Sequence, residues 1–358
     1  MLAASQLLRS LQLERHFPTM CCAIAYGSGV FPQQTDTASA SDTTPLIDLL
    51  FVVEDAVSWH RDNLNKNRRH YSGLRLFGPE VIARVQQGYG AQLYYHTNVA
   101  VAGRRVKYGV VTRRDLVNDL LCWRHLYAAG RLQKPTAQQS FGDLRSAEHR
   151  ELSAALTANR RAALATALLC QPASFDLDSL FETITRLSYT GDIRMGVAED
   201  QHKVRNIVFG PGGLQAFTEV YVPLLEELPF SSVVEAATSG AYCQTFRFAN
   251  SSSVSSSAKV TPLLSPEHLS CLGEALPAVV LADVNDVASS ANAPHGSLPV
   301  GAWWQTADVG ARTLRVQQRI ACIVGSSSRT QAIKGVLSAG LSTSCSYVLR
   351  KVKKRLHT

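Results

Sequence analysis

Apolar and polar residues follow each other along the first 135 positions in a pattern typical of alternating strands and helices. Two apolar runs, CCAIAY at 21–26 and PLIDLLFVVED at 45–55, predict buried strands. Further segments of this part are predicted as helices at 56–65, 79–87 and 115–129 and as short strands at 92–95 and 105–112. This order predicts an α/β (α+β) fold.

The second half of the chain is predicted to be mainly helical, with helices at 148–169, 179–187, 213–228 and 329–356. Between them, the segment from Thr238 to Gly301 contains SSSVSSS at 251–257 and several prolines, which is typical of a loop-rich insertion. We therefore divide the chain into a possible mitochondrial presequence 1–20, a first α/β domain 21–135, a helical domain 136–237, the insertion 238–300 and a C-terminal region 301–358.

The first twenty residues support two interpretations. Leucines at 2, 7, 8, 11 and 13 alternate with Arg9 and Arg15, as in a basic amphipathic presequence, whereas Glu14 disfavours it. An ordinary N-terminal helix of the fold explains the same residues.

Composition narrows the class of protein. A hydrophobic share of 46% indicates a globular chain, and no apolar run reaches the roughly 18 to 20 residues that a membrane-spanning helix needs. Lys and Arg total 36 against 28 Asp and Glu, so the net charge of +8 favours a polyanionic partner: nucleotide, nucleic acid or anionic lipid. The 8 cysteines form no C-x-x-C pair, which argues against a zinc knuckle or a disulfide-stapled fold.

The first candidate chemistry lies between the two opening strands. Gly27, Ser28 and Gly29 follow the first strand, and small residues there let backbone N–H groups approach a polyphosphate. Asp48 stands inside the apolar second strand, where an ionised carboxylate needs a cation such as Mg²⁺ or strong donors. A tight turn without a ligand, and an aspartate satisfied by backbone donors, remain the alternatives.

A Gly-Ser turn paired with a strand aspartate is the pattern of nucleotidyltransferases of the DNA polymerase β superfamily. Two features depart from it: 19 residues separate Ser28 from Asp48, and the position two beyond Asp48 is Leu50 in place of a second acid. A second metal ligand must then come from Glu54, Asp55 or Asp192. We favour Asp192, because it lies in a polar segment beside Gly191 and Arg194.

Long segments in the same order carry a wider resemblance. They are AYGSGVFPQ, IDLLFVVEDAVSWHRDNLNKNRRHYSGLRLFGP, VKYGVV, LYAAGRLQKP, LSYTGDIRM, AEDQHKV and KGVLSAGLSTSCSYVLRKVKKR. Together they strongly resemble the mitochondrial CDP-diacylglycerol synthase family named for translocator assembly and maintenance. The resemblance covers nearly the whole chain except 238–301.

The resemblance implies a polymerase-β-like nucleotidyltransferase domain, a winged-helix-like domain and a C-terminal membrane-contacting region. It implies CTP, Mg²⁺ and phosphatidic acid as ligands, at the matrix face of the inner mitochondrial membrane, in phospholipid (cardiolipin) synthesis. By matching motifs, Gly27, Ser28, Gly29 and Tyr108 are expected at the nucleotide, Asp48 and Asp192 at the metal, and Asp48, Lys107, Arg131 and Lys134 in catalysis. Because phosphatidate is already ionised near neutral pH, His60 and His70 are expected to be structural or to contact phosphate, and not to act as a general base.

The C-terminal segment indicates a membrane contact without any family. Apolar residues recur at helical spacing from Ile333 to Leu356, and the end is basic, with Arg350, Lys351, Lys353, Lys354 and Arg355. We expect this helix to bind an anionic membrane surface; a solvated tail on a packed helix is the alternative.

Two other functions share some of these features. A nucleic-acid nucleotidyltransferase would use the same turn and Asp48, but the basic residues gather on a terminal amphipathic helix, so no nucleic acid partner is expected. A non-catalytic membrane adaptor that supports protein import would need neither the turn nor the acids.

Overall fold

The fold is described by a computed structural model that places residues 2–31, 45–193, 195, 202–227, 230–238, 244–248, 272, 276–277, 280 and 309–339. Its main sheet has the order β3-β4-β2-β1-β5, in which only β2 and β4 run parallel. The strands are β1 Cys22–Tyr26, β2 Ile47–Val53, β3 Tyr94–Val101, β4 Arg104–Thr112 and β5 Ala137–Ser140. A smaller antiparallel sheet has the order β6-β8-β7, with β6 Ser174–Asp176, β7 Val234–Thr238 and β8 Gln244–Phe248.

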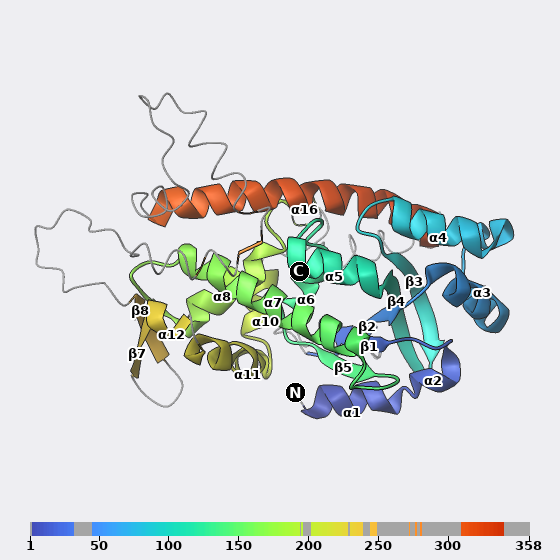
Figure 1. Cartoon of the computed structure of the whole chain (residues 1–358), viewed down its shortest axis with the longest axis horizontal. Helices are drawn as coiled ribbons and strands as arrows, with labels where there is room; N and C mark the ends of the chain where they lie inside the picture. Colours follow the sequence, from blue (N-terminus) through green and yellow to red (C-terminus); the bar gives the residue numbers. More distant parts are fainter. Residues whose placement is uncertain are drawn as a thin grey trace, which may run out of the picture.

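Helices surround both sheets (Figure 1). They are α1 Leu2–Ser10, α2 Leu13–His16, α3 Ala56–Asn67, α4 Gly78–Gly88, α5 Arg113–Cys122, α6 Ala128–Leu132, α7 Ala147–Leu169, α8 Leu177–Leu187, α10 Lys203–Val208, α11 Gly213–Glu226, α12 Phe230–Val233 and α16 Val309–Ala339, with 3₁₀ helices η1 Arg68–His70 and η2 Gly73–Phe77. A mixed sheet with helices on both faces confirms the predicted α+β class.

Alternation along the strands divides the core into two layers. Leu50 and Val52 of β2 point to the face covered by α5, α6 and α7, whereas Leu49 and Phe51 point to the face that holds Phe17 and Trp59. Each layer is a continuous cluster of buried apolar side chains. Trp59 and Trp123 are both buried, at 3% and 0% exposure.

The helix predicted at 115–129 is two helices. α5 ends at Cys122, and Trp123 and Leu126 take left-handed backbone conformations with φ of 50° and 49°. The buried carboxylate of Asp119 explains the break, because it accepts hydrogen bonds from four backbone N–H groups of the connection and of α6. This connection orients α6, which carries Arg131.

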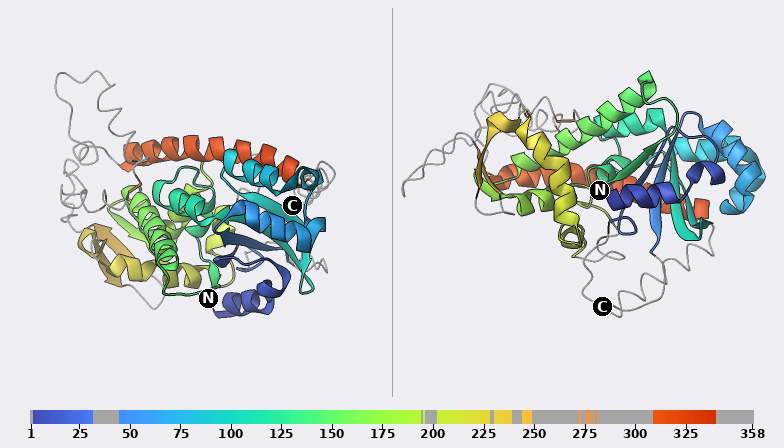
Figure 2. Two further views of the ribbon diagram at one scale, coloured as in Figure 1. Left: turned by 45° about the vertical axis from the view of Figure 1, so that its right-hand side comes forward. Right: turned by 90° about the horizontal axis from the view of Figure 1, so that it is seen from below.

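The unit predicted to begin at 136 does not begin there. β5 pairs with β1 through Cys22 to Ala25 and is the edge strand of the first sheet. The predicted C-terminal helix also begins earlier, at Val309 in place of Arg329. α16 runs along the molecule from the helical part to α4 (Figures 1 and 2), and Val316, Ile320 and Val324 join the core.

The N-terminal residues pack on the main sheet. α1 lies against β5, and Leu8, Leu11 and Leu13 are buried at 0–1% exposure. In this structure the segment is part of the core, as the second interpretation of the sequence expected; its role as a presequence stays a prediction.

No helix among the described residues combines the length and the apolar character needed to cross a bilayer. The expected basic turns at 350–355, the Ser-rich run at 251–257 and Trp303 and Trp304 lie outside the described residues.

Candidate active site

The candidate site is built around Asp48 at the start of β2. Asp48 lies beside Tyr26 of β1 and Lys107 of β4, all three on the sheet face that α6 covers. The Lys107 ammonium donates to Asp48 Oδ1 at 2.9 Å. Both side chains keep about a quarter of their surface exposed, 22% for Asp48 and 24% for Lys107, so the pair is open to a ligand.

The glycine turn that follows β1 borders this carboxylate. Val30 and Phe31 donate backbone N–H groups to the Gly27 carbonyl at 3.1 and 2.9 Å, and Ser28 is exposed at the tip. Gly27 has a φ of 78°, and a Cβ there would lie 3.4 Å from Asp48 Oδ2. At Gly29 a Cβ would collide with the Leu46 carbonyl at 2.0 Å. The two glycines therefore allow the turn to pack against β2 and leave Oδ2 accessible.

Four cations stack on tyrosine rings on the same side of the sheet. Lys107 Nζ lies 4.8 Å from the centre of Tyr95, and Arg131 Cζ lies 3.7 Å from that of Tyr127. Lys134 and Lys203 both face Tyr189, at 4.9 and 5.6 Å. With Tyr26, whose hydroxyl is 3.3 Å from that of Tyr95, these residues form what we call the cation–tyrosine cluster.

Electrostatics set the charges of this cluster. Burial lowers the pKa of Lys107, but the charge and hydrogen bond of Asp48, with smaller contributions from Tyr95 and Tyr127, together raise that pKa above its usual value, so Lys107 stays cationic. Burial raises the pKa of Tyr26 and Tyr95, so both phenols stay neutral. Burial, followed by repulsion from Arg131 and Lys203, holds the pKa of Lys134 well below its usual value. An incoming polyanion would relieve that repulsion.

Hydrogen bonds join the cluster to the helical part of the chain. Lys134 donates to the Gly130 carbonyl and to Ser188 Oγ, both at 2.6 Å. Gly130 is close to Ser188, since a Cβ there would lie 2.3 Å from Ser188 Cβ. Arg131 donates to the Tyr127 carbonyl. The site therefore lies where α6 of the first part meets the loop after α8.

Asp192 lies on that same loop. Its backbone N–H donates to the Tyr189 carbonyl at 3.1 Å, and the residue is 7% exposed. Gly191, with a φ of 80°, lets the loop contact Ala321 of α16 at a distance no Cβ would permit. The structure thus brings the Asp192 loop to the cluster, while its role as a metal ligand stays a prediction.

The other two acids proposed as second ligands lie at the far end of β2. Glu54 lies six positions beyond Asp48, about 20 Å along a strand. Glu54 accepts from Arg113 at 2.7 Å, and Asp55 caps α3 by accepting from Ser58 N at 2.7 Å. Neither can share a metal ion with Asp48.

Tyr108 lies apart from the other predicted site residues. Being next to Lys107 on β4, it points to the opposite face, where it is 0% exposed. Its hydroxyl is 2.9 Å from His70 Nδ1 and accepts from Asn63 at 3.2 Å, and its ring stacks on Phe51. Nothing in this position supports the nucleotide contact predicted for Tyr108.

His60 belongs to the same buried polar group. Its Nε2 faces Gln86 Oε1 and its Nδ1 faces the Tyr71 hydroxyl, both at 2.8 Å. Burial lowers the pKa of His60 to about 4. Both positions agree with the structural role expected for His60 and His70.

The donor set around Asp48 fits Mg²⁺ in one respect. Mg²⁺ in nucleotide enzymes is held by one or two carboxylates together with substrate phosphates, and Asp48 Oδ2 is free of a neighbouring Cβ at Gly27. Among the described residues, no three or more His, Cys, Asp and Glu side chains are grouped to bind a metal ion. An Mg²⁺ ion at Asp48 would therefore take its other ligands from a bound triphosphate, and the role of Asp48 as a metal ligand stays a prediction.

Comparison with known proteins identifies the relatives of this chain. Residues 10–354 match the family described as "Phosphatidate cytidylyltransferase, mitochondrial". The chain belongs to this family. A Danio rerio relative of that name is 36% identical over 339 residues, which cover 93% of this chain and 89% of the relative. A Xenopus laevis relative is 36% identical over 343 residues, 94% of this chain and 90% of the relative, and a Mus musculus relative is 44% identical over 215 residues, 60% and 61%.

Family membership confirms the resemblance seen in the sequence. The structure adds site residues that the sequence did not indicate. Tyr26, Tyr95, Tyr127, Tyr189 and Lys203 complete the cation–tyrosine cluster. Tyr127, Tyr189 and Lys203 stand in the segments LYAAGRLQKP, LSYTGDIRM and AEDQHKV that carry the resemblance. These motifs therefore contain the three residues, but the tyrosine rings and the cations come together only in the folded chain.

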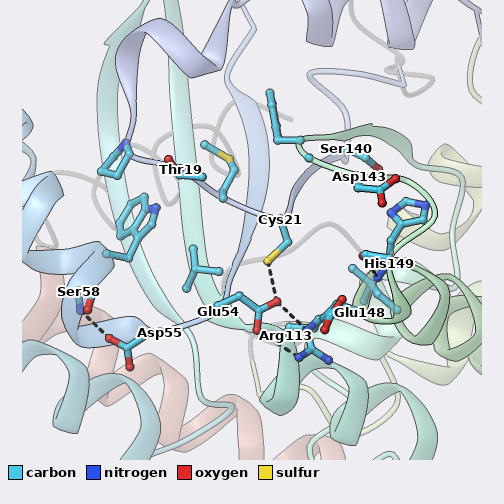
Figure 3. A pocket seen from close by; sticks show the side chains of 18 of the residues that line it. Thr19, Cys21, Glu54, Asp55, Ser58, Arg113, Ser140, Asp143, Glu148 and His149 are labelled. Atoms are coloured by element: carbon cyan, nitrogen blue, oxygen red, sulfur yellow. Dashed lines mark hydrogen bonds and ion pairs between the residues drawn. The ribbon is translucent and has the colours of Figure 1, made fainter.

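A cavity of about 720 Å³ lies at the other end of the sheet (Figure 3). Its acidic lining comprises Glu54, Asp55, Asp62, Asp143 and Glu148. Glu54 is paired with Arg113 and accepts from Cys21 Sγ at 3.2 Å. We call this space the acidic cavity. Its carboxylates would repel a triphosphate, so size alone does not make it the nucleotide site.

Proposed function

We propose that this chain is a mitochondrial phosphatidate cytidylyltransferase that joins CTP and phosphatidic acid to give CDP-diacylglycerol and pyrophosphate. The observation that carries the proposal is the cation–tyrosine cluster beside Asp48, in a chain whose relatives bear that enzyme's name. The reaction brings together two anionic substrates, so catalysis depends on positioning and charge neutralisation.

Each part of the site has a task in this reaction. The turn at Gly27, Ser28 and Gly29 would hold the β and γ phosphates of CTP. A phosphate oxygen of phosphatidic acid attacks the α-phosphorus, a new P–O bond forms, and the bond between the α and β phosphates breaks to release pyrophosphate. Lys107, Arg131 and Lys134 offset the negative charge that gathers as the two phosphates approach.

Lys203 extends this cationic group, since it shares the Tyr189 ring with Lys134. A site with cations on both the sheet and the helical loops can hold two phosphate-bearing substrates side by side. Tyr95, which burial keeps neutral, orients Lys107 without adding negative charge.

Mg²⁺ is the proposed cofactor. Bound at Asp48, with Asp192 as the proposed second carboxylate, it would neutralise charge on the triphosphate and favour departure of pyrophosphate. Lys107 donates to Oδ1 of Asp48 and so orients the carboxylate.

The proposal extends to fold and location. We assign the first sheet with Asp48 to a polymerase-β-like nucleotidyltransferase domain, and the helices α8, α10 and α11 with the sheet β6-β8-β7 to a winged-helix-like domain. The names of the relatives suggest mitochondria. We propose peripheral attachment to the matrix side of the inner membrane, where the product would feed cardiolipin synthesis.

Transfer from labelled CTP tests the function. Purified protein is incubated with CTP and Mg²⁺, and with either phosphatidic acid vesicles or RNA. Label in a lipid product, with pyrophosphate released, is the expected result. Label in RNA would indicate a nucleic-acid nucleotidyltransferase, and no transfer from a folded protein would favour a non-catalytic adaptor.

A further inference from the structure

A short surface between α3 and α4 exposes apolar side chains next to basic ones. Leu76 and Phe77, the last two residues of η2, keep 73% and 67% of their surface exposed. Burial of such side chains is favourable, and two adjacent large apolar residues at this exposure are typical of an interaction site.

Most of the charge around this pair is positive. Between Asp62 and Glu80 the sequence contains no acid and four basic residues, Lys66, Arg68, Arg69 and Arg75, all exposed. The Glu80 carboxylate lies beside Gly78 and is paired with Arg61 at 3.7 Å. We call residues 68–77 the Arg–Leu–Phe surface. Exposed apolar residues among arginines are complementary to an anionic lipid bilayer, whose headgroups bind the cations and whose acyl boundary accepts the apolar side chains.

The surface rests on a well-packed base, so its exposure does not come from a poorly packed loop. Tyr71 is 3% exposed, and its hydroxyl accepts from Asn63 at 2.9 Å. Leu74 packs on the small core formed with Ile82 and Tyr94. Tyr71 and the partly buried Leu74 therefore anchor this segment, which still leaves Leu76 and Phe77 outside.

The same side of the molecule leads to the C-terminal segment. α4 begins directly after Phe77, and at its other end Lys334 of α16 donates to the carbonyls of Gln86 and Tyr89 at 2.6 and 2.7 Å. Figures 1 and 2 show α4 beside this end of α16. Nearby, Tyr89 and Ile333 are 63% and 68% exposed. From α16 the chain continues into residues 340–358, with five basic residues at 350–355.

We propose that the Arg–Leu–Phe surface docks on an anionic lipid bilayer, with Leu76 and Phe77 in the interface and Arg68, Arg69 and Arg75 at the headgroups. This inference deepens the proposed function, because it adds a second membrane contact to that of the C-terminal segment. Two separate contacts orient an enzyme on a bilayer, whereas a single terminal helix only tethers it.

The test uses full-length protein and co-sedimentation with vesicles of equal parts phosphatidylcholine and phosphatidylglycerol, an anionic lipid that is not the substrate. We expect Leu76→Ser/Phe77→Ser to weaken binding about tenfold. Arg68→Gln/Arg69→Gln/Arg75→Gln should weaken it on the order of 100-fold at low salt, from about 1 kcal/mol per arginine. Matched controls are Leu144→Ser, at a side chain 59% exposed, and Arg9→Gln/Arg104→Gln/Arg124→Gln, at exposed arginines of other elements.

Equal binding by the test and control variants would overturn the proposal. A test variant that binds vesicles normally but changes the oligomeric state in gel filtration would show that the surface binds a second copy, and would also overturn it. Melting temperatures within a few degrees of wild type show that the exposed changes leave the fold intact.

Activity separates this inference from the proposed function. With the Leu76→Ser/Phe77→Ser variant, cytidylyl transfer to phosphatidic acid in vesicles should fall while transfer to a dispersed short-chain phosphatidate is unchanged. If the wild-type chain transfers no cytidylyl group, the proposed function fails, and the sedimentation result still decides the surface.

Discussion

The two ends of the main sheet differ in charge. At one end Asp48 lies among four cations that lie on tyrosine rings. At the other end the acidic cavity of about 720 Å³ is lined by five carboxylates, with Arg113 paired to Glu54 and Glu151. The acidic cavity therefore suits an anionic substrate less well. Charge, and not cavity size, decides which end binds a triphosphate.

The difference also shows how one strand serves both ends. β2 brings Asp48 to the cationic end and leads into Glu54 at the acidic end, with an apolar core between them. At the cationic end the ion pair with Lys107 is the main contact of Asp48. At the acidic end Glu54 is paired with Arg113, and Asp55 caps α3. Four experiments can test this contrast, described from the largest expected effect to the smallest.

Removing one negative charge at each end should have very different consequences. We expect Asp48→Asn to lower kcat/KM at least 100-fold, about 2.7 kcal/mol, since the proposed metal ligand is lost at nearly constant volume. Glu54→Gln should change kcat/KM less than about twofold, because Glu54 lies at the far end of β2. The fold should also tolerate the change, because an exposed ion pair contributes at most about 1 kcal/mol to stability. Steady-state kinetics and thermal melting measure both. If Asp48→Asn keeps more than about a tenth of wild-type activity, Asp48 is not a principal ligand.

The glycine turn sharpens the contrast at the cationic end. Gly27→Ala should raise the KM for CTP about tenfold, because its Cβ would stand 3.4 Å from Asp48 Oδ2. Gly103 is the matched control, with a φ of 73° against 78° and no atom within 4 Å of its Cβ position. Both variants bear a similar backbone strain of about 1–2 kcal/mol, seen in melting. An equal KM in both would show that no phosphate is bound at Gly27.

At Lys134 the uptake of a proton on CTP binding can be measured. Its lowered pKa means that part of the Lys134 population is neutral in the free protein at high pH, and a bound polyanion would raise that pKa. CTP binding above the lowered pKa should then take up a proton, by up to one per site. Calorimetry in two buffers of different ionisation enthalpy measures this uptake. Unchanged uptake in Lys134→Met would assign the proton to another group.

The smallest effect is expected at the acidic end. Burial, together with the hydrogen bond and charge of Glu54, raises the pKa of the Cys21 thiol to about 12. Below that pH the thiolate is rare, so alkylation of Cys21 by iodoacetamide should be much slower than that of exposed Cys122. Glu54→Gln should speed it severalfold. Equal rates at Cys21 in the two proteins would show that Glu54 does not control this thiol.

Much of the local structure could be predicted from the sequence. β1, β2, α3 and α4 lie within a few residues of their predicted positions, since each has a strong apolar period of its own. The break after α5 could not be predicted, because it depends on the Asp119 carboxylate, which accepts hydrogen bonds from four backbone N–H groups. The edge strand β5 could not be predicted either, because its pairing with β1 joins segments that are far apart in the sequence.

By itself the sequence determined the class of fold, the family and most of the charged residues of the site. The sequence alone indicates four charged site residues: Asp48, Lys107, Arg131 and Lys134. The structure brings them to one end of one sheet face. Alternation along β4 requires that Lys107 and Tyr108 point to opposite faces. Which face meets α6 and the loop after α8 was decided only by tertiary packing, because that choice depends on how distant apolar surfaces are buried together.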